Sequence, residues 1–167
     1  MFFMHGYMGN WNLYQGIFKD LEDCIVLSVG TKTWSGLYSE SDINTLFTKQ
    51  IPFLKKLGYK IDTNNLHIIG LSNGGSASNV AYRKFSNQFK TITFISTGIK
   101  QIYPIASKVL FIGGGKDFSS GSLYEAYRTL KNQGNKTNIY WDKDETHFIL
   151  VNQTDEIIEF LNKNLKQ

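Results

Sequence analysis

Short apolar runs alternate with longer stretches in which apolar residues recur every three or four positions, from one end of the chain to the other. The short runs are typical of buried strands, and the longer stretches are typical of amphipathic helices. Strands that alternate with helices favour a parallel sheet with helices on both faces. We therefore expect an α/β fold, a three-layer α/β/α sandwich around a mostly parallel, six-stranded sheet. Its strands are predicted at Met1–His5, Cys24–Val29, Leu66–Gly70, Thr91–Ile95, Val109–Gly113 and Thr137–Trp141.

The helical stretches are placed by the spacing of their apolar residues. The longest, Ser41–Leu57, carries its apolar residues on one face and contains Pro52, which we expect to bend or divide the helix. The last helix is predicted to begin near Thr154, with acidic residues in its first turn and lysines near its end, as the helix dipole favours. No linker or repeat interrupts the series, so we expect a single domain over residues 1–167. The remaining helices are predicted at Trp11–Leu21, after Ser72 and at Ser122–Asn132.

The composition narrows the class of protein. Hydrophobic residues make up 41% of the 167 residues and charged residues 19%, which is too apolar a mixture for a disordered chain. The formal charge of +4 comes from basic residues that are spread along the chain, so no nucleic-acid partner is expected. No apolar run is long enough to span a membrane, Cys24 is the only cysteine, and the first residues do not resemble a signal peptide. We therefore expect a cytoplasmic protein without a membrane partner.

The strongest chemical signal is the segment Gly70-Leu71-Ser72-Asn73-Gly74. It has the pattern G-x-S-x-G and stands directly after a predicted strand and before a predicted helix. A sharp turn from strand to helix strains the backbone of its corner residue, and small residues two positions before and after it let the chain segments pass. We expect this turn to lift the hydroxyl group of Ser72 to the carboxyl edge of the sheet. An ordinary Gly-rich turn without catalytic function is the alternative.

A serine hydroxyl needs a general base and an orienting acid to act as a nucleophile near neutral pH. Of the three histidines, His147 lies in a loop suited to reach over the carboxyl edge of the sheet, whereas His67 lies within a predicted strand and is expected in the core. For the acid, Asp117 follows the strand that ends at Gly113, on the same edge as Ser72; an aspartate that only stabilises a turn is the alternative. Three acidic residues close to the loop histidine also stay open as the acid: Asp142, Asp144 and Glu145.

Serine, aspartate and histidine occur here in the order that is typical of the α/β-hydrolase family, and the chain resembles that family over nearly its whole length. The pair His5-Gly6 after an early strand adds to the resemblance, which is strongest to small members without a lid. The resemblance implies the strand order 2-1-3-4-5-6 and the absence of the two leading strands of full-size members. The chain departs from the family pattern in the residue before Ser72 and in the residues after Asp117, and these departures bear on substrate preference.

The same resemblance implies an oxyanion hole formed by two backbone N–H groups. One belongs to Asn73 and the other comes from the loop after the first strand, from Tyr7 or alternatively from Met8. His5 is then structural and holds its loop through hydrogen bonds.

The chain between the serine and the aspartate is too short for a cap domain, so we expect a shallow cleft that is open to solvent. Aromatic side chains around such a cleft favour short or medium acyl groups or an aryl ester, although any of them can instead pack in the core. The expected substrate-binding rim consists of Tyr7, Met8, Trp11, Trp34, Tyr38, Phe118 and Phe148.

No cofactor and no metal are expected. The segment Gly113–Lys116 lacks the following serine or threonine and the first glycine of a phosphate-binding loop, and no cysteine, histidine and carboxylate group has zinc spacing. We predict a serine hydrolase that cleaves small carboxylic esters through an acyl-enzyme on Ser72. Two alternatives stay open: a thioesterase, amidase or acyltransferase with the same triad, and a non-catalytic binding protein on the hydrolase fold.

Overall fold

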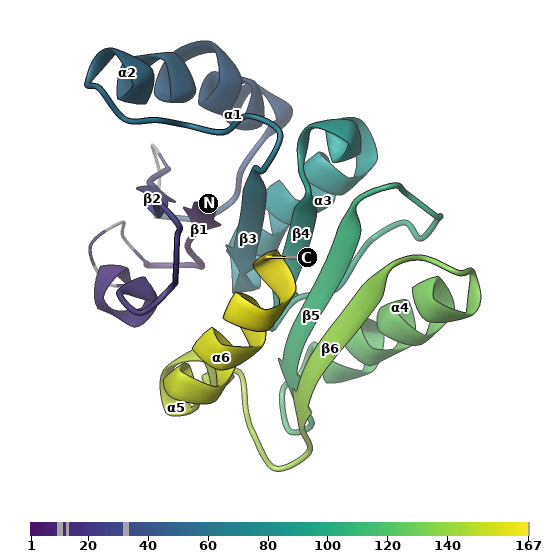
Figure 1. Cartoon of the computed structure of the whole chain (residues 1–167). Coiled ribbons are helices and arrows are strands. Elements are labelled where there is room, and N and C mark those ends of the chain that lie inside the picture. Colours follow the sequence, from purple (N-terminus) through teal and green to yellow (C-terminus); the bar gives the residue numbers. More distant parts are fainter. Residues whose placement is uncertain (10–11, 13, 32–33, 167) are drawn as a thin grey trace.

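A single parallel sheet forms the centre of the computed structural model, which describes residues 1–9, 12, 14–31 and 34–166. The sheet has six strands in the order β2-β1-β3-β4-β5-β6, and every neighbouring pair is parallel, as Figure 1 shows. This order confirms the one predicted from the sequence. The strands are β1 Phe2–Met4, β2 Leu27–Val29, β3 His67–Leu71, β4 Thr91–Ile95, β5 Lys108–Gly114 and β6 Thr137–Asp142.

Helices cover both faces of this sheet and complete the three layers. In Figure 1, α5 and α6 lie in front of the sheet, and α3 and α4 lie behind it. None of the helices in the described part of the chain has the length and apolar character needed to cross a membrane. The helices are α1 Glu40–Thr45, α2 Ile51–Lys56, α3 Gly75–Lys84, α4 Ser120–Asn132, α5 Ile149–Asn152 and α6 Thr154–Leu165, with 3₁₀ turns at Gln15–Phe18, Ser72–Gly74 and Ser86–Gln88.

Alternate residues of the strands pack into two separate apolar clusters, one on each face. In β5, Val109 and Phe111 belong to the cluster under α1–α4, while Leu110 and Ile112 belong to the cluster under α5 and α6. Side chains of successive strand residues point to opposite faces, so a strand covered by helices on both sides must be apolar at every position. This requirement explains the continuous apolar runs from which the strands were predicted.

The predicted helix Ser41–Leu57 is present but divided. A π-helical segment, Leu46–Gln50, separates α1 from α2, and Pro52 lies at the start of α2. Proline has no backbone N–H and its ring crowds the preceding turn, so the regular helical hydrogen bonding cannot continue through this position. At the other end, Ser39 caps α1 in a capping box with Asp42.

Three other predicted elements are shorter in the structure, and the first strand covers Phe2–Met4 rather than Met1–His5. Within the described part of the predicted helix Trp11–Leu21, which lacks residues 11 and 13, the structure has the 3₁₀ turn Gln15–Phe18. The second strand begins at Leu27 rather than at Cys24. β2 lies at the edge of the sheet and its residues are only half-buried. An edge strand pairs on one side only, so less of its apolar run is held in a ladder.

Candidate active site

The turn from β3 into α3 holds Ser72 in an unusual backbone conformation. Its φ angle is +53°, in the left-handed region that residues with a Cβ rarely occupy. A Cβ atom on Gly70 would lie 2.4 Å from the carbonyl oxygen of Gly74, and a Cβ on Gly74 would lie 2.1 Å from the carbonyl oxygen of Met4. Both positions therefore require glycine, which is the physical reason for the small residues two before and two after the serine.

Three side chains from distant parts of the chain meet at this turn. The Ser72 Oγ atom lies 2.8 Å from Nε2 of His147, and Nδ1 of the same ring lies 3.1 Å from each carboxylate oxygen of Asp117. The ionised carboxylate can only accept hydrogen bonds, so the proton of the neutral imidazole belongs on Nδ1. Nε2 is then free to accept the hydrogen bond from the serine hydroxyl.

The carboxylate of Asp117 is completely buried and is held by the loop that follows it. The backbone N–H of Ser119 donates to one of its oxygens at 2.9 Å, and the hydroxyl group of Ser119 donates to the other at 3.0 Å. Burial by itself raises the pKa of this carboxyl, but the hydrogen bonds from Ser119 and His147 outweigh burial and hold the pKa of Asp117 below its ordinary value. The carboxylate therefore stays ionised beside the imidazole.

The loop that carries His147 is positioned by close packing against a glycine run that the sequence analysis did not connect with the site. A Cβ on Gly114 would lie 2.3 Å from the carbonyl oxygen of Glu145, and a Cβ on Gly115 would lie 2.4 Å from that of Lys143. The backbone N–H of Lys116 donates to the Glu145 carbonyl at 2.8 Å. Glycines at the end of β5 thus let the histidine loop approach closely enough for its ring to reach the serine.

Ser96 is a second supporting residue that the sequence analysis missed. It follows β4, is buried, has a φ angle of +49°, and its hydroxyl group donates to the backbone carbonyl of His147 at 3.2 Å. The sequence gives one signal for such a residue, a serine directly after a buried strand on the same edge as Ser72. That signal does not indicate that Ser96 forms a hydrogen bond with the backbone carbonyl of His147.

The loop after β1 passes directly over the serine. A Cβ on Gly6 would lie 3.0 Å from the Cβ of Ser72, and Tyr7 and Asn73 both line the cavity at this point. The N–H of Met8 donates to the Trp34 carbonyl at 2.9 Å, so it is already engaged and does not suit the alternative oxyanion role. The side-chain amide of Asn73 donates to the Ser35 carbonyl at 2.8 Å, and this hydrogen bond fixes the orientation of the side chain.

His5 lies beneath this loop as an internal support. It is buried, and its Nδ1 lies 2.8 Å from the carbonyl oxygen of Gly6. Its ring also meets the ring of Tyr38 edge-on, with centroids 5.9 Å apart. These contacts agree with the structural role expected for His5.

A cavity of about 480 Å³ opens above the serine. Of the seven expected rim residues, Tyr7, Phe118 and Phe148 line it. Three further apolar residues that the sequence analysis did not single out also line it: Tyr14, Leu150 and Val151.

The other expected rim residues that the structure describes, Met8, Trp34 and Tyr38, do not line this cavity. Met8 and Trp34 are exposed but do not belong to its lining, and Trp11 lies outside the described residues. Tyr38 is buried, and its hydroxyl group donates to the carbonyl of Val29 at 2.6 Å. The expectation for Tyr38 is therefore wrong, because a phenol whose ring packs in the core and whose hydroxyl is bound to the backbone cannot reach a substrate.

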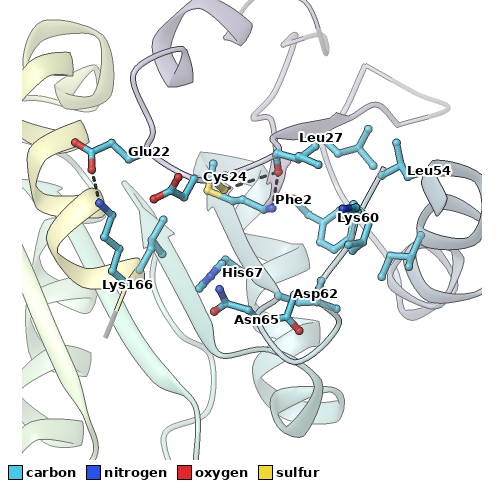
Figure 2. A pocket seen from close by; sticks show the side chains of 17 residues that line it. Phe2, Glu22, Cys24, Leu27, Leu54, Lys60, Asp62, Asn65, His67 and Lys166 are labelled. Atoms are coloured by element: carbon cyan, nitrogen blue, oxygen red, sulfur yellow. Dashed lines mark hydrogen bonds and ion pairs between the residues drawn. The ribbon is translucent and has the colours of Figure 1, made fainter. Parts of the chain in front are cut away.

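A second cavity, of about 200 Å³, lies at the amino ends of β1 and β3, at the opposite edge of the sheet from Ser72. Figure 2 shows His67, Asn65 and Cys24 around it and the ion pair between Glu22 and Lys166 at its side. Among the described residues, no hydrogen bond joins Cys24 to His67, and no group of histidine, cysteine and acidic residues could hold a metal ion. The serine with a histidine in hydrogen-bond contact lies in the first cavity.

Comparison with known proteins gives similarity in structure but not in sequence. No protein-family model and no curated protein matches the chain. A carboxylesterase from Bacillus cereus is 22% identical, with a TM-score of 0.69 over 97% of this chain and 86% of that chain. A ferulic acid esterase is 16% identical, with a TM-score of 0.72 over 98% and 84% of the two chains. The type II thioesterase BorB from the borrelidin biosynthetic cluster is 12% identical, with a TM-score of 0.66 over 99% and 90%.

These neighbours share the parallel sheet, its flanking helices and nearly the full length of the chain, although the sequence identities are low. The order of the strands and the turn that holds Ser72 agree with the resemblance stated from the sequence. The chain has the α/β-hydrolase fold.

Proposed function

We propose that this protein is a serine hydrolase that cleaves small carboxylic esters through an acyl-enzyme on Ser72. One observation carries the proposal: the hydrogen-bonded series from the serine hydroxyl through His147 to Asp117, with distances of 2.8 Å and 3.1 Å. A nucleophile, a base that contacts it and an acid that orients the base are the three parts that acyl transfer requires. The esterase neighbours support the same class of reaction through their fold.

In the first half of the proposed reaction, the Ser72 oxygen attacks the ester carbonyl while its proton passes to Nε2 of His147. The carbonyl oxygen becomes negatively charged and accepts hydrogen bonds from the backbone N–H groups of Tyr7 and Asn73. The imidazolium that forms is stabilised by the ionised Asp117. Nε2 then returns the proton to the leaving alkoxide, the C–O bond breaks, and the acyl group stays on the serine.

Water completes the proposed cycle by the same steps. His147 takes a proton from water, the hydroxide attacks the acyl carbonyl, and the proton returns to the Ser72 oxygen as the carboxylic acid leaves. The positive end of α3, which begins at Gly75 just after the serine, favours negative charge at this position. No step requires a cofactor.

A fluorophosphonate probe tests the proposal, because it forms a covalent adduct with an activated serine only. We expect mass spectrometry to locate the adduct at Ser72 and labelling to be lost in His147→Ala. Ser72→Ala is expected to lose about 10⁶-fold in kcat on an ester, by comparison with serine hydrolases in which the nucleophile was removed. Ser41→Ala, an exposed serine in α1, and His67→Asn are the matched controls and retain labelling. Ester hydrolysis that persists in Ser72→Ala contradicts the proposal.

A panel of substrates separates the proposed ester chemistry from its alternatives. A panel with one acyl group presented as an ester, a thioester and an amide gives the preferred bond from the ratio of kcat/KM values. Adding an alcohol as acceptor reveals transfer as the formation of a new ester. A protein that is not labelled and hydrolyses none of these compounds is a binding protein on the hydrolase fold.

A further inference from the structure

Two phenylalanines beside the catalytic histidine are unusually exposed for apolar side chains. Phe118 is 86% exposed and Phe148 is 66% exposed, and both line the cavity above Ser72. Phe118 directly follows Asp117, and Phe148 directly follows His147, so the sequence ties each ring to a member of the triad. Exposed apolar side chains that gather around a cavity mark a surface that binds an apolar group.

The rings take different positions around the imidazole. The ring of Phe118 stacks on that of His147, with centroids 4.7 Å apart and planes at 25°. The ring of Phe148 meets the imidazole edge-on, with centroids 6.2 Å apart and planes at 83°. Both phenylalanines therefore lie beside the base of the proposed reaction.

The chemistry of the proposed reaction determines which part of a substrate lies beside His147. Nε2 must protonate the leaving oxygen, so that oxygen lies within hydrogen-bond distance of the ring when the C–O bond breaks. The substituent on the leaving oxygen is then a neighbour of the imidazole, while the acyl group stays attached to the Ser72 oxygen. The aromatic pair is accordingly placed to contact the alcohol part of an ester.

The charge of the cavity limits the substrate further. Its lining contains no lysine, arginine, aspartate or glutamate within the described ranges, and His147 is the one ionisable base among its residues. A charged alcohol would leave solvent without an ion-pair partner, at a cost in free energy. An uncharged ring can instead stack or meet these rings edge-on, an arrangement that adds to the burial of apolar area.

Building on the proposed function, we propose that Phe118 and Phe148 form a leaving-group subsite that selects uncharged esters of aromatic alcohols. The specificity then resides mainly in the alcohol rather than in the acyl group.

Acetate esters test this proposal because all of them form the same acetyl-enzyme. Benzyl acetate and cyclohexylmethyl acetate differ in the aromatic character of the alcohol but have the same number of carbon atoms. We expect kcat/KM, measured by acid release and divided by the rate of hydroxide-catalysed hydrolysis of each ester, to favour benzyl acetate by about tenfold. Phe118→Leu and Phe148→Leu are expected to bring this ratio close to one, whatever their effect on the absolute rates. Phe53→Leu, an exposed phenylalanine in α2 outside the cavity, is the control and keeps the ratio.

The outcomes distinguish the subsite from the proposed function on which it rests. Hydrolysis that depends on Ser72 but shows no preference for benzyl acetate overturns the subsite and leaves the serine hydrolase intact. A preference that survives in both leucine variants overturns the assignment to these two residues. If Ser72 is not labelled by fluorophosphonate and no acetate ester is hydrolysed, the proposed function fails and the subsite fails with it.

Discussion

A buried histidine away from the triad makes the stability of this protein depend on pH. His67 begins β3, is 4% exposed, and its Nδ1 lies 2.8 Å from the hydroxyl oxygen of Thr91. Burial, with further contributions from the positive charges of the N-terminal amino group and of Lys90, lowers the pKa of His67 from 6.5 to about 4. Between these two values the unfolded chain binds a proton that the folded chain does not, so acid favours unfolding.

The size of the effect follows from the two pKa values. The contribution of neutral His67 to the free energy of unfolding is fully present above about pH 6.5 and is lost as the pH falls from about 6.5 to about 4. At about 1.4 kcal/mol for each pH unit, the complete loss is about 3 kcal/mol, of which about 2 kcal/mol is lost by pH 5.

His67→Asn isolates this contribution, because the amide cannot be protonated in this range and can still form a hydrogen bond with the Thr91 hydroxyl. We expect the free energy of urea unfolding of the unsubstituted protein, relative to that of His67→Asn, to fall by about 2 kcal/mol between pH 7.5 and pH 5. All other titrating groups are present in both proteins, so their contributions cancel in the comparison. A difference that does not change with pH, or that changes in the opposite direction, refutes the reasoning. An NMR titration of the His67 ring with a midpoint near 6.5, the ordinary pKa of histidine, also refutes the reasoning.

Three further substitutions test the supports of the site and of one helix. Gly114→Ala forces the His147 loop away from the serine and is expected to lower kcat/KM about 100-fold; Gly121→Ala, whose added methyl group meets open space, is the control and is expected to retain activity. Ser119→Ala removes one of the hydrogen bonds that lower the pKa of Asp117, so the pKa of this carboxyl is expected to rise toward its ordinary value; an NMR titration of the Asp117 carboxyl that shows no rise contradicts the assignment. Ser39→Ala removes the cap of α1 and is expected to reduce the free energy of unfolding by about 1 kcal/mol, measured in urea, without altering ester hydrolysis.

The positions of the strands and the nucleophile turn could be predicted because their signals are local, whereas the order of the strands was implied by the family resemblance. A strand buried on both faces must be apolar throughout, and a sharp strand-to-helix turn must be flanked by small residues, so both features are visible in a few consecutive letters. The prediction that Ser72, Asp117 and His147 meet needed more, namely that loops after parallel strands share one edge of the sheet. Their distances could not be predicted, because these depend on how the loops pack.

The parts that the sequence analysis missed all depend on contacts between distant segments. Gly114 lies in a glycine run whose sequence locates Asp117 but does not indicate that a carbonyl of the histidine loop packs against it. Tyr38 was expected at the rim because it is an aromatic residue in a predicted loop, but its ring packs in the core and its hydroxyl is bound to β2. Aromatic residues in loops serve packing and binding equally well, and only the fold decides between them.

The position of β1 in the sheet has a consequence for the synthesis of the protein. β1 leaves the ribosome before β3, yet it lies inside the sheet and pairs with β3, whose residues come more than sixty positions later. At roughly 5–20 residues per second, several seconds pass before β3 is available, and during that time the apolar β1 has no partner on that side. The nascent chain must therefore keep the apolar residues of β1 from aggregating until β3 has been translated, and slower translation lengthens that period.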